Sequence, residues 1–178
     1  NKKFNLLNSL NVTVLYEALC KDSINFIQDQ LLPAYPYFED FIHINFVPFG
    51  KSRSVNNGES FECHHGPDEC MSNKIQSCAL NELQDEPSQV SFVACQMSDN
   101  CANKFGMNYQ DIVNCYSTEL GTKLQLHAEL ITKHIDPKFV PTILYNSQFS
   151  QSLQDQSLDN FAGVLCALLK RKPSICFN

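Results

Sequence analysis

Nine cysteines in a chain of 178 residues restrict the folds open to this sequence more than any other feature. A density this high fits an oxidising compartment, in which disulfides form and persist. The sequon Asn11-Val12-Thr13 points the same way, with Asn11 as the predicted glycosylation site. Because the count is odd, one thiol must stay free, pair with another molecule or do chemistry. The nine are Cys20, Cys63, Cys70, Cys78, Cys95, Cys101, Cys115, Cys166 and Cys176.

The first third of the chain has the pattern of a strand, a helix and a second strand. Residues 10–16 alternate in polarity like a strand, and apolar residues within 24–32 recur at helical spacing. Pro33 is predicted to end that helix or to follow its end closely. A second strand is predicted near 41–47. Cys20 then lies where the first strand passes into the helix.

The rest of the chain is predicted to be mostly helical. Residues 50–87 are polar and carry three cysteines, which favours a segment held by disulfides. A strand led by proline is predicted at 140–145, and a last helix at about 158–172 with Ser157 as its cap. Between these segments, helical periodicity appears at 90–97, 111–116 and 120–131.

Length and composition indicate one domain over residues 1–178, with an insertion at roughly 50–135. Strands alternating with helices suit an α/β architecture, in which helices cover a central sheet. The net charge of -6 argues against a general nucleic-acid binder or a protein that binds anionic membranes. No apolar run approaches the roughly 18 residues of a membrane span.

The segment Cys20-Lys21-Asp22-Ser23 carries the first chemical motif, since it follows a strand and opens a helix. A C-x-x-C at this place is typical of thioredoxin-like redox proteins. A helix N-terminus stabilises a thiolate, and Lys21 should help while Asp22 should oppose. Ser23 stands where the second cysteine would be. Its hydroxyl could donate a hydrogen bond to the thiolate, but it cannot resolve a mixed disulfide.

The second motif runs from Cys63 to Cys78 and contains His64 and His65. Cysteine and histidine at these spacings could be read as zinc ligands. Disulfides are the better interpretation in a chain of the secretory route, so no metal and no cofactor is predicted. The pattern C-x-H-G-x-x-E-C-x-x-N-x-x-x-x-C resembles the signature of the γ-interferon-inducible lysosomal thiol reductases. It matches at Cys63, His65, Gly66, Glu69, Cys70, Asn73 and Cys78, whereas His64 replaces the glutamine of that signature.

The resemblance implies a thioredoxin-like fold with a disulfide-stapled, largely helical insertion. The richness in cysteine and the small size of the chain favour the insect members of the family. The resemblance also implies a secreted or lysosomal protein that acts on protein disulfides at acidic pH. The family's C-x-x-C maps onto Cys20 to Ser23, so the nucleophile is present and the resolving thiol is absent. By the same resemblance, Pro141 is expected to be a cis-proline that faces the redox motif. Val140, Pro141 and Lys21 are then predicted to bind substrate.

Three functions stay open on this sequence. The first is a protein that binds disulfide-bearing or extended polypeptides without two-thiol turnover. The second is a monothiol reductase, in which Cys20 reacts and an external thiol such as glutathione resolves the product. The third is an active reductase in which Ser23 was introduced to trap a mixed disulfide. A monomer and a disulfide-linked dimer are both compatible with one unpaired cysteine.

Eight cysteines besides Cys20 can form four bridges, and sequence alone does not choose among the possible pairings. We expect Cys166 to pair with Cys176, because the tail after Pro173 can fold back onto the last helix. The three cysteines of the second motif are expected to tie the insertion to itself and to the helical region that follows.

Overall fold

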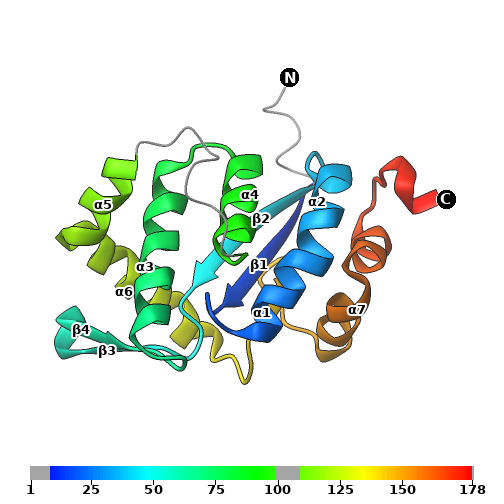
Figure 1. Cartoon of the computed structure of the whole chain (residues 1–178). Coiled ribbons are helices and arrows are strands. Elements are labelled where there is room, and N and C mark those ends of the chain that lie inside the picture. The colour runs from blue at the N-terminus through cyan, green and yellow to red at the C-terminus, as the bar shows by residue number, and fades with distance from the viewer. Residues whose placement is uncertain (1–8, 99–108, 178) are drawn as a thin grey trace.

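A three-stranded mixed sheet in the order β2-β1-β5 forms the centre of the protein (Figure 1). The computed structural model describes residues 9–98 and 109–177. β1 (Leu10–Tyr16) pairs in parallel with β2 (Ile42–Pro48) and antiparallel with β5 (Thr142–Tyr145). All three strands lie where the sequence predicts them, within two residues, because their side chains alternate or are continuously apolar.

Both faces of this sheet are covered by helices. On one face, Val12 and Val14 pack in the main core with side chains of the first helical segment, of α4 (Glu86–Gln96) and of α7 (Gln151–Leu168). On the other face, Leu15 packs against α6 (Glu119–Ile135). In Figure 1, α3 lies on the β2 side of the molecule with α5 beyond it, and α7 lies on the opposite side, next to the first helical segment. The α/β architecture predicted from the sequence is therefore confirmed.

The helical segment after β1 is longer than predicted. α1 (Lys21–Asn25), a π-helix (Phe26–Leu31) and α2 (Leu32–Phe38) follow one another without a break. The prediction that Pro33 ends the helix is wrong. Pro33 is the second residue of α2, directly after the π-helix, where the hydrogen-bond spacing of the helix changes and a missing N–H is tolerated.

The polar segment after β2 is more ordered than its composition suggested. It contains an antiparallel hairpin of β3 (Arg53–Val55) and β4 (Ser60–Glu62), joined by a 3-10 turn at Asn56–Gly58. A helix of 16 residues follows, α3 (Pro67–Glu82). Apolar periodicity did not predict α3, because most of the side chains that it buries are polar: Glu69, Asn73, Gln76 and Ser77, besides Cys78 and Ala79.

Disulfides fasten the helical region, which also contains α5 (Tyr109–Ser117). Cys63 bonds to Cys70, and Cys78 bonds to Cys115. Cys166 bonds to Cys176, which lies in a terminal 3-10 turn (Ser174–Phe177), so that predicted pairing is confirmed. Cys95 is disulfide-bonded as well, and Cys101 lies outside the described residues. The single domain with an insertion at 50–135 stays a prediction.

The last helix begins earlier than predicted. Ser150, and not Ser157, is its N-cap, and the Ser150 Oγ accepts a hydrogen bond from Leu153 N. Ser157 lies inside α7, where it is buried and bonded to the Tyr145 hydroxyl at 2.6 Å. The first turns of α7 bury polar side chains, so apolar periodicity did not reveal them.

Ser150→Ala is expected to lower the free energy of unfolding by about 1 kcal/mol, the usual contribution of a serine N-cap. Urea unfolding at one fixed pH measures the change. Ser152→Ala is the matched control, because Ser152 is exposed within the same first turn of the helix and caps nothing. Equal losses in the two variants would contradict the assignment of the cap.

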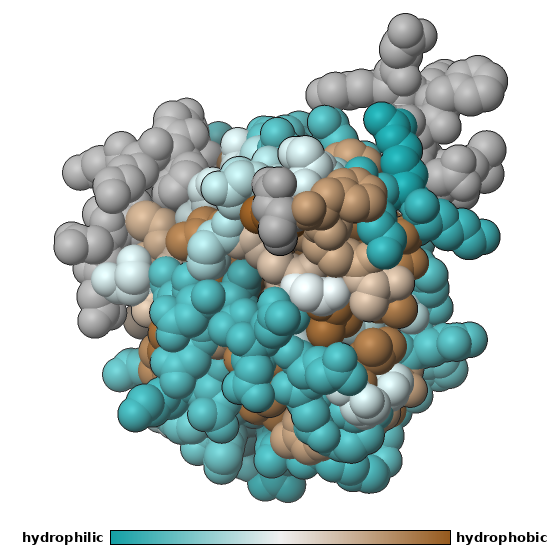
Figure 2. All heavy atoms as spheres, turned by 90° about the vertical axis from the view of Figure 1, so that its right-hand side faces the viewer, coloured by the Kyte–Doolittle hydropathy of each residue, from teal (hydrophilic) through white to brown (hydrophobic). Residues whose placement is uncertain are grey.

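The molecular surface on the side of α7 exposes apolar as well as polar side chains (Figure 2). Within residues 9–98 and 109–177, none of the helices combines the length and the apolar character needed to cross a membrane.

Candidate thiol site

Cys20 stands at the junction between β1 and the helical segment. It is the N-cap residue of α1, with an extended backbone, and its carbonyl accepts a hydrogen bond from Ile24 N at 2.9 Å. It is also the free cysteine among the described residues, and it is 9% exposed. The predicted position of Cys20, where β1 passes into a helix, agrees with the structure.

Ser23 lies one helical turn beyond Cys20 and is fully buried. Its Oγ accepts a hydrogen bond from Glu17 N at 3.4 Å, so it helps to hold the loop that leads into α1. A hydroxyl at this position offers no second sulfur. The site as built contains one thiol.

The loop before β5 closes over Cys20. The Val140–Pro141 peptide bond is cis, as predicted, and the Cys20 thiol donates to the Val140 carbonyl at an Sγ–O distance of 3.8 Å. Gln154 of α7 holds this loop from behind. Its Nε2 donates to the Pro141 carbonyl at 3.0 Å, and its Oε1 accepts from Ile143 N at 2.8 Å.

Two shallow hollows flank the Val140 backbone, each of about 290 Å³. The first contains Cys20 and Lys21 and is completed by Asp22, Lys51, His64, His65, Phe139 and Val140. The second lies along α1 and the π-helix and contains Pro141. Asp22, Phe139 and Val140 line both hollows, so the two adjoin beside the thiol. The predicted residues Lys21, Val140 and Pro141 are thus brought close to Cys20.

Side chains of α3 anchor the loop that carries Cys20. Glu69 is fully buried, and its carboxylate accepts hydrogen bonds from Leu19 N at 3.3 Å and from His65 N at 3.1 Å. Asn73 Oδ1 accepts from Ala18 N at 2.9 Å. The signature residues Glu69 and Asn73 therefore fix the backbone just before the thiol.

The other signature residues shape the start and end of α3. Gly66 is its N-cap at a φ of 88°, a backbone conformation that favours glycine. Cys63 and Cys70 bridge the first turn, and Cys78 joins the last turn to α5. None of these cysteines carries a free thiol, so the zinc alternative that would have used them is excluded at Cys63, Cys70 and Cys78.

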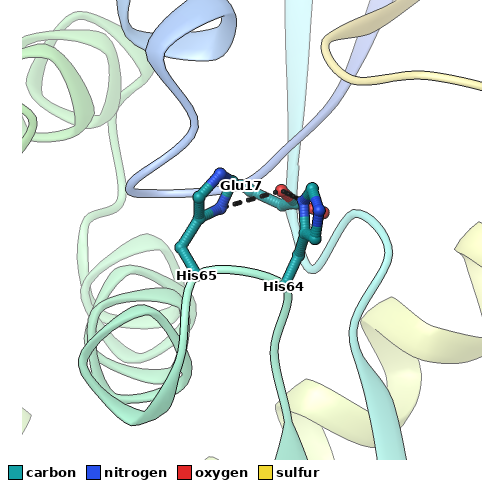
Figure 3. Close-up of side chains that lie close together, drawn as sticks. All are labelled: Glu17, His64 and His65. Carbon is teal, nitrogen blue, oxygen red and sulfur yellow. Dashed lines mark ion pairs between the residues drawn. The ribbon is translucent and has the colours of Figure 1, made fainter.

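Sequence reasoning missed Glu17 and Tyr16. Tyr16 ends β1, and its buried hydroxyl donates to Gln76 Oε1 in α3. Burial raises the pKa of the Tyr16 phenol well above its ordinary value, so it stays a neutral donor. Glu17 follows it and is fully buried beside His64 and His65 (Figure 3). A glutamate next to a strand gave no signal, because its partners come from a segment 47 and 48 residues away.

Comparison with known protein families identifies the family to which this chain belongs. The family model described as "Gamma interferon inducible lysosomal thiol reductase (GILT)" matches residues 11–119, which contain Cys20, the whole of α3 and all of β1 except Leu10. The chain belongs to the GILT family. The resemblance read from the second motif is thereby confirmed.

Relatives of several animal groups agree with this assignment. GILT-like protein 1 of Drosophila melanogaster is 33% identical, over 93% of this chain and 77% of that protein. A gamma-interferon-inducible lysosomal thiol reductase-like protein of Anopheles gambiae is 32% identical, over 94% and 80%. A protein of Carassius auratus named gamma-interferon-inducible lysosomal thiol reductase is 29% identical, over 98% and 74%.

Solved structures confirm the thioredoxin-like fold of this GILT-family chain. The oxidoreductase DsbA of Xylella fastidiosa superposes with a TM-score of 0.58, 10% identity and coverage of 90% of this chain and 86% of that one. A thioredoxin-like oxidoreductase of Silicibacter pomeroyi gives a TM-score of 0.54 at 8% identity, with 87% of both chains covered. Identities this low bear on the fold alone.

Proposed function

We propose that this GILT-family chain binds disulfide-bearing or extended polypeptides beside Cys20 and does not carry out two-thiol reduction. The observation that carries the proposal is the pair formed by a free Cys20 at the start of α1 and a buried Ser23 one turn later. A two-thiol reductase needs a second thiol to resolve its mixed disulfide, and Ser23 supplies an alcohol instead.

The loop at Val140 and Pro141 supports the binding part of the proposal. Thr142 begins β5, and the hollows on either side of Val140 leave room for side chains of an extended segment. Lys21 lines the hollow that contains the thiol and supplies a positive charge there. An extended polypeptide that crosses Cys20 would bring its own disulfide against the sulfur.

Monothiol reduction is the second candidate, and the free Cys20 favours it. The Cys20 thiolate attacks one sulfur of the substrate disulfide and releases the other sulfur as a thiolate, which takes up a proton. A small thiol such as glutathione then attacks the mixed disulfide and frees the reduced substrate. A second molecule of that thiol regenerates Cys20 and leaves as the oxidised dimer, so atoms and electrons balance.

A secreted or lysosomal location belongs to the same proposal. Relatives carry the word lysosomal in their names, and disulfides at Cys63–Cys70, Cys78–Cys115 and Cys166–Cys176 suit an oxidising route. Asn11 is exposed in β1 and remains the proposed glycosylation site. A monomer fits the 9% exposure of Cys20 better than a dimer linked through that sulfur.

Mixing the protein with a fluorescent peptide disulfide tests the proposal. The expected result is one covalently captured peptide per chain, attached at Cys20 by mass, and no further turnover until glutathione is added. Cys20→Ala is expected to abolish covalent capture, because it removes the free thiol while the disulfides elsewhere stay paired. Repeated turnover without an external thiol would contradict the proposal, as would capture that survives Cys20→Ala.

A further inference from the structure

Glu17, His64 and His65 converge from two separate segments of the chain (Figure 3). Glu17 lies in the loop after β1, while the two histidines lie between β4 and α3. Both imidazole Nδ1 atoms face the same carboxylate oxygen, Glu17 Oε2. The distances from that oxygen are 3.5 Å to His64 and 3.3 Å to His65.

The second observation is the state of the Glu17 carboxylate. Glu17 is fully buried, and its Oε1 accepts a hydrogen bond from Lys51 N at 2.7 Å. Gly50 makes room for it, because a Cβ at that glycine would come within 2.2 Å of Glu17 Cγ. The backbone turn thus orients one oxygen and aims the other at the histidines. Oε2 itself is buried without a hydrogen-bond partner.

A buried carboxylate oxygen without a partner is costly unless a cation compensates it. His65 does not donate to it, because its Nδ1 lies closer to Glu69 Oε2, at 2.6 Å. His64 lies near Glu17 Oε2 without hydrogen-bond geometry, and its side chain is 58% exposed. A positive charge placed between the three side chains would therefore stabilise the buried Glu17 Oε2.

The two distances from Glu17 Oε2 fit a transition metal ion. Ligand atoms around one tetrahedral Zn²⁺, each about 2.0–2.1 Å from the metal, lie about 3.3–3.4 Å from one another. We propose that Glu17 Oε2 and the Nδ1 atoms of His64 and His65 bind one divalent ion of the Zn²⁺ class. Two imidazoles and a carboxylate are a donor set that suits this ion. Binding releases any proton held on His64 Nδ1 or His65 Nδ1 to solvent, and His65 Nδ1 gives up its contact with Glu69 Oε2. Glu69 keeps its hydrogen bonds from Leu19 N and His65 N.

This site is independent of the thiol mechanism. The histidines line the same hollow as Cys20, but the three ligand atoms meet without the sulfur. His64 stands where the GILT signature has glutamine, so this donor set is a feature of this chain and does not follow from the signature. Three protein ligands leave a fourth position for water, open to the hollow.

Titration with Zn²⁺ alone tests the inference on the folded, disulfide-bonded protein. The expected result is one Zn²⁺ per chain with micromolar or tighter affinity. His64→Gln is expected to weaken binding at least about tenfold, because it removes one of three ligands. The His64 side chain is exposed, and its replacement is not expected to disturb folding. His64→Gln therefore tests Zn²⁺ binding even if Glu17→Gln does not fold.

Two controls separate the outcomes. His43→Gln removes another histidine that already faces a carboxylate, that of Glu86, and it is expected to leave Zn²⁺ affinity unchanged. Cys20→Ala is also expected to keep full Zn²⁺ affinity, although it abolishes peptide capture. The experiment can therefore distinguish failure of the metal-site inference from failure of the proposed function. Absence of stoichiometric Zn²⁺, equal affinity in His64→Gln, or loss of affinity in Cys20→Ala would each overturn the assignment.

Discussion

Ser23→Cys is expected to turn the chain into a two-thiol reductase, with peptide-disulfide reduction at least about tenfold faster than that of the unaltered protein. Tenfold corresponds to about 1.4 kcal/mol in activation free energy. The reason is that a thiol one turn after Cys20 completes a C-x-x-C at a helix start, where it can resolve the mixed disulfide within the chain. The rate is measured with dithiothreitol as the electron source.

Ser23→Ala is the matched control for this experiment. It removes the same hydrogen bond to Glu17 N and adds no sulfur, so it is expected to stay without two-thiol activity. Mass spectrometry must also detect an internal bridge between Cys20 and the introduced sulfur. A Ser23→Cys protein that forms this bridge and still fails to reduce the peptide would contradict the proposed binding of polypeptide beside Val140 and Pro141.

Glu69→Ala is expected to lower the free energy of unfolding by about 2–4 kcal/mol. The change leaves Leu19 N and His65 N without their carboxylate acceptor, and an unpaired donor that is shielded from water costs about 1–3 kcal/mol. Urea unfolding at neutral pH measures the loss. The same variant should also make Cys20 react faster with an alkylating reagent, because the loop before it loses an anchor to α3.

Glu82→Ala serves as the control for Glu69→Ala. Glu82 is in the last turn of the same helix, is exposed, and accepts a hydrogen bond from the exposed side chain of its neighbour Asn81. Its loss is expected to change stability by less than about 0.5 kcal/mol, as surface substitutions usually do. Similar losses in the two variants would show that Glu69 does not support the loop.

The sheet could be predicted from the sequence because its strands carry a simple signal. β1 has Val12 and Val14 on one face of the sheet, and β5 is buried throughout, with apolar side chains at Ile143 and Leu144. The helices were harder wherever their buried faces are polar. α3 was missed and the start of α7 was misplaced, since Glu69, Asn73 and Gln154 are buried through hydrogen bonds and give no apolar periodicity.

The candidate site was only partly predictable for a similar reason. Cys20, Ser23 and Pro141 belong to motifs that can be read locally, and the structure brings Cys20 and the Pro141 loop together. Glu17 carries no local motif. Its significance depends on Gly50 and on the histidines, which approach it only after the chain has folded. These contacts join segments that are far apart in the sequence, so local sequence patterns could not predict them.

The helix that steadies the Cys20 loop is itself secured by covalent bonds, and the two bonds differ in how easily reductants can reach them. Cys78 and Cys115 are enclosed at the far end of α3, whereas Cys63 and Cys70 are partly open to solvent at its first turn. A small thiol of the kind proposed to regenerate Cys20 would therefore also meet the Cys63–Cys70 pair, because Cys63 directly precedes His64 in the hollow beside Cys20. If Cys20 reacts as proposed, a reductant able to open the Cys63–Cys70 bridge would loosen the start of α3 as well as regenerate the Cys20 thiol.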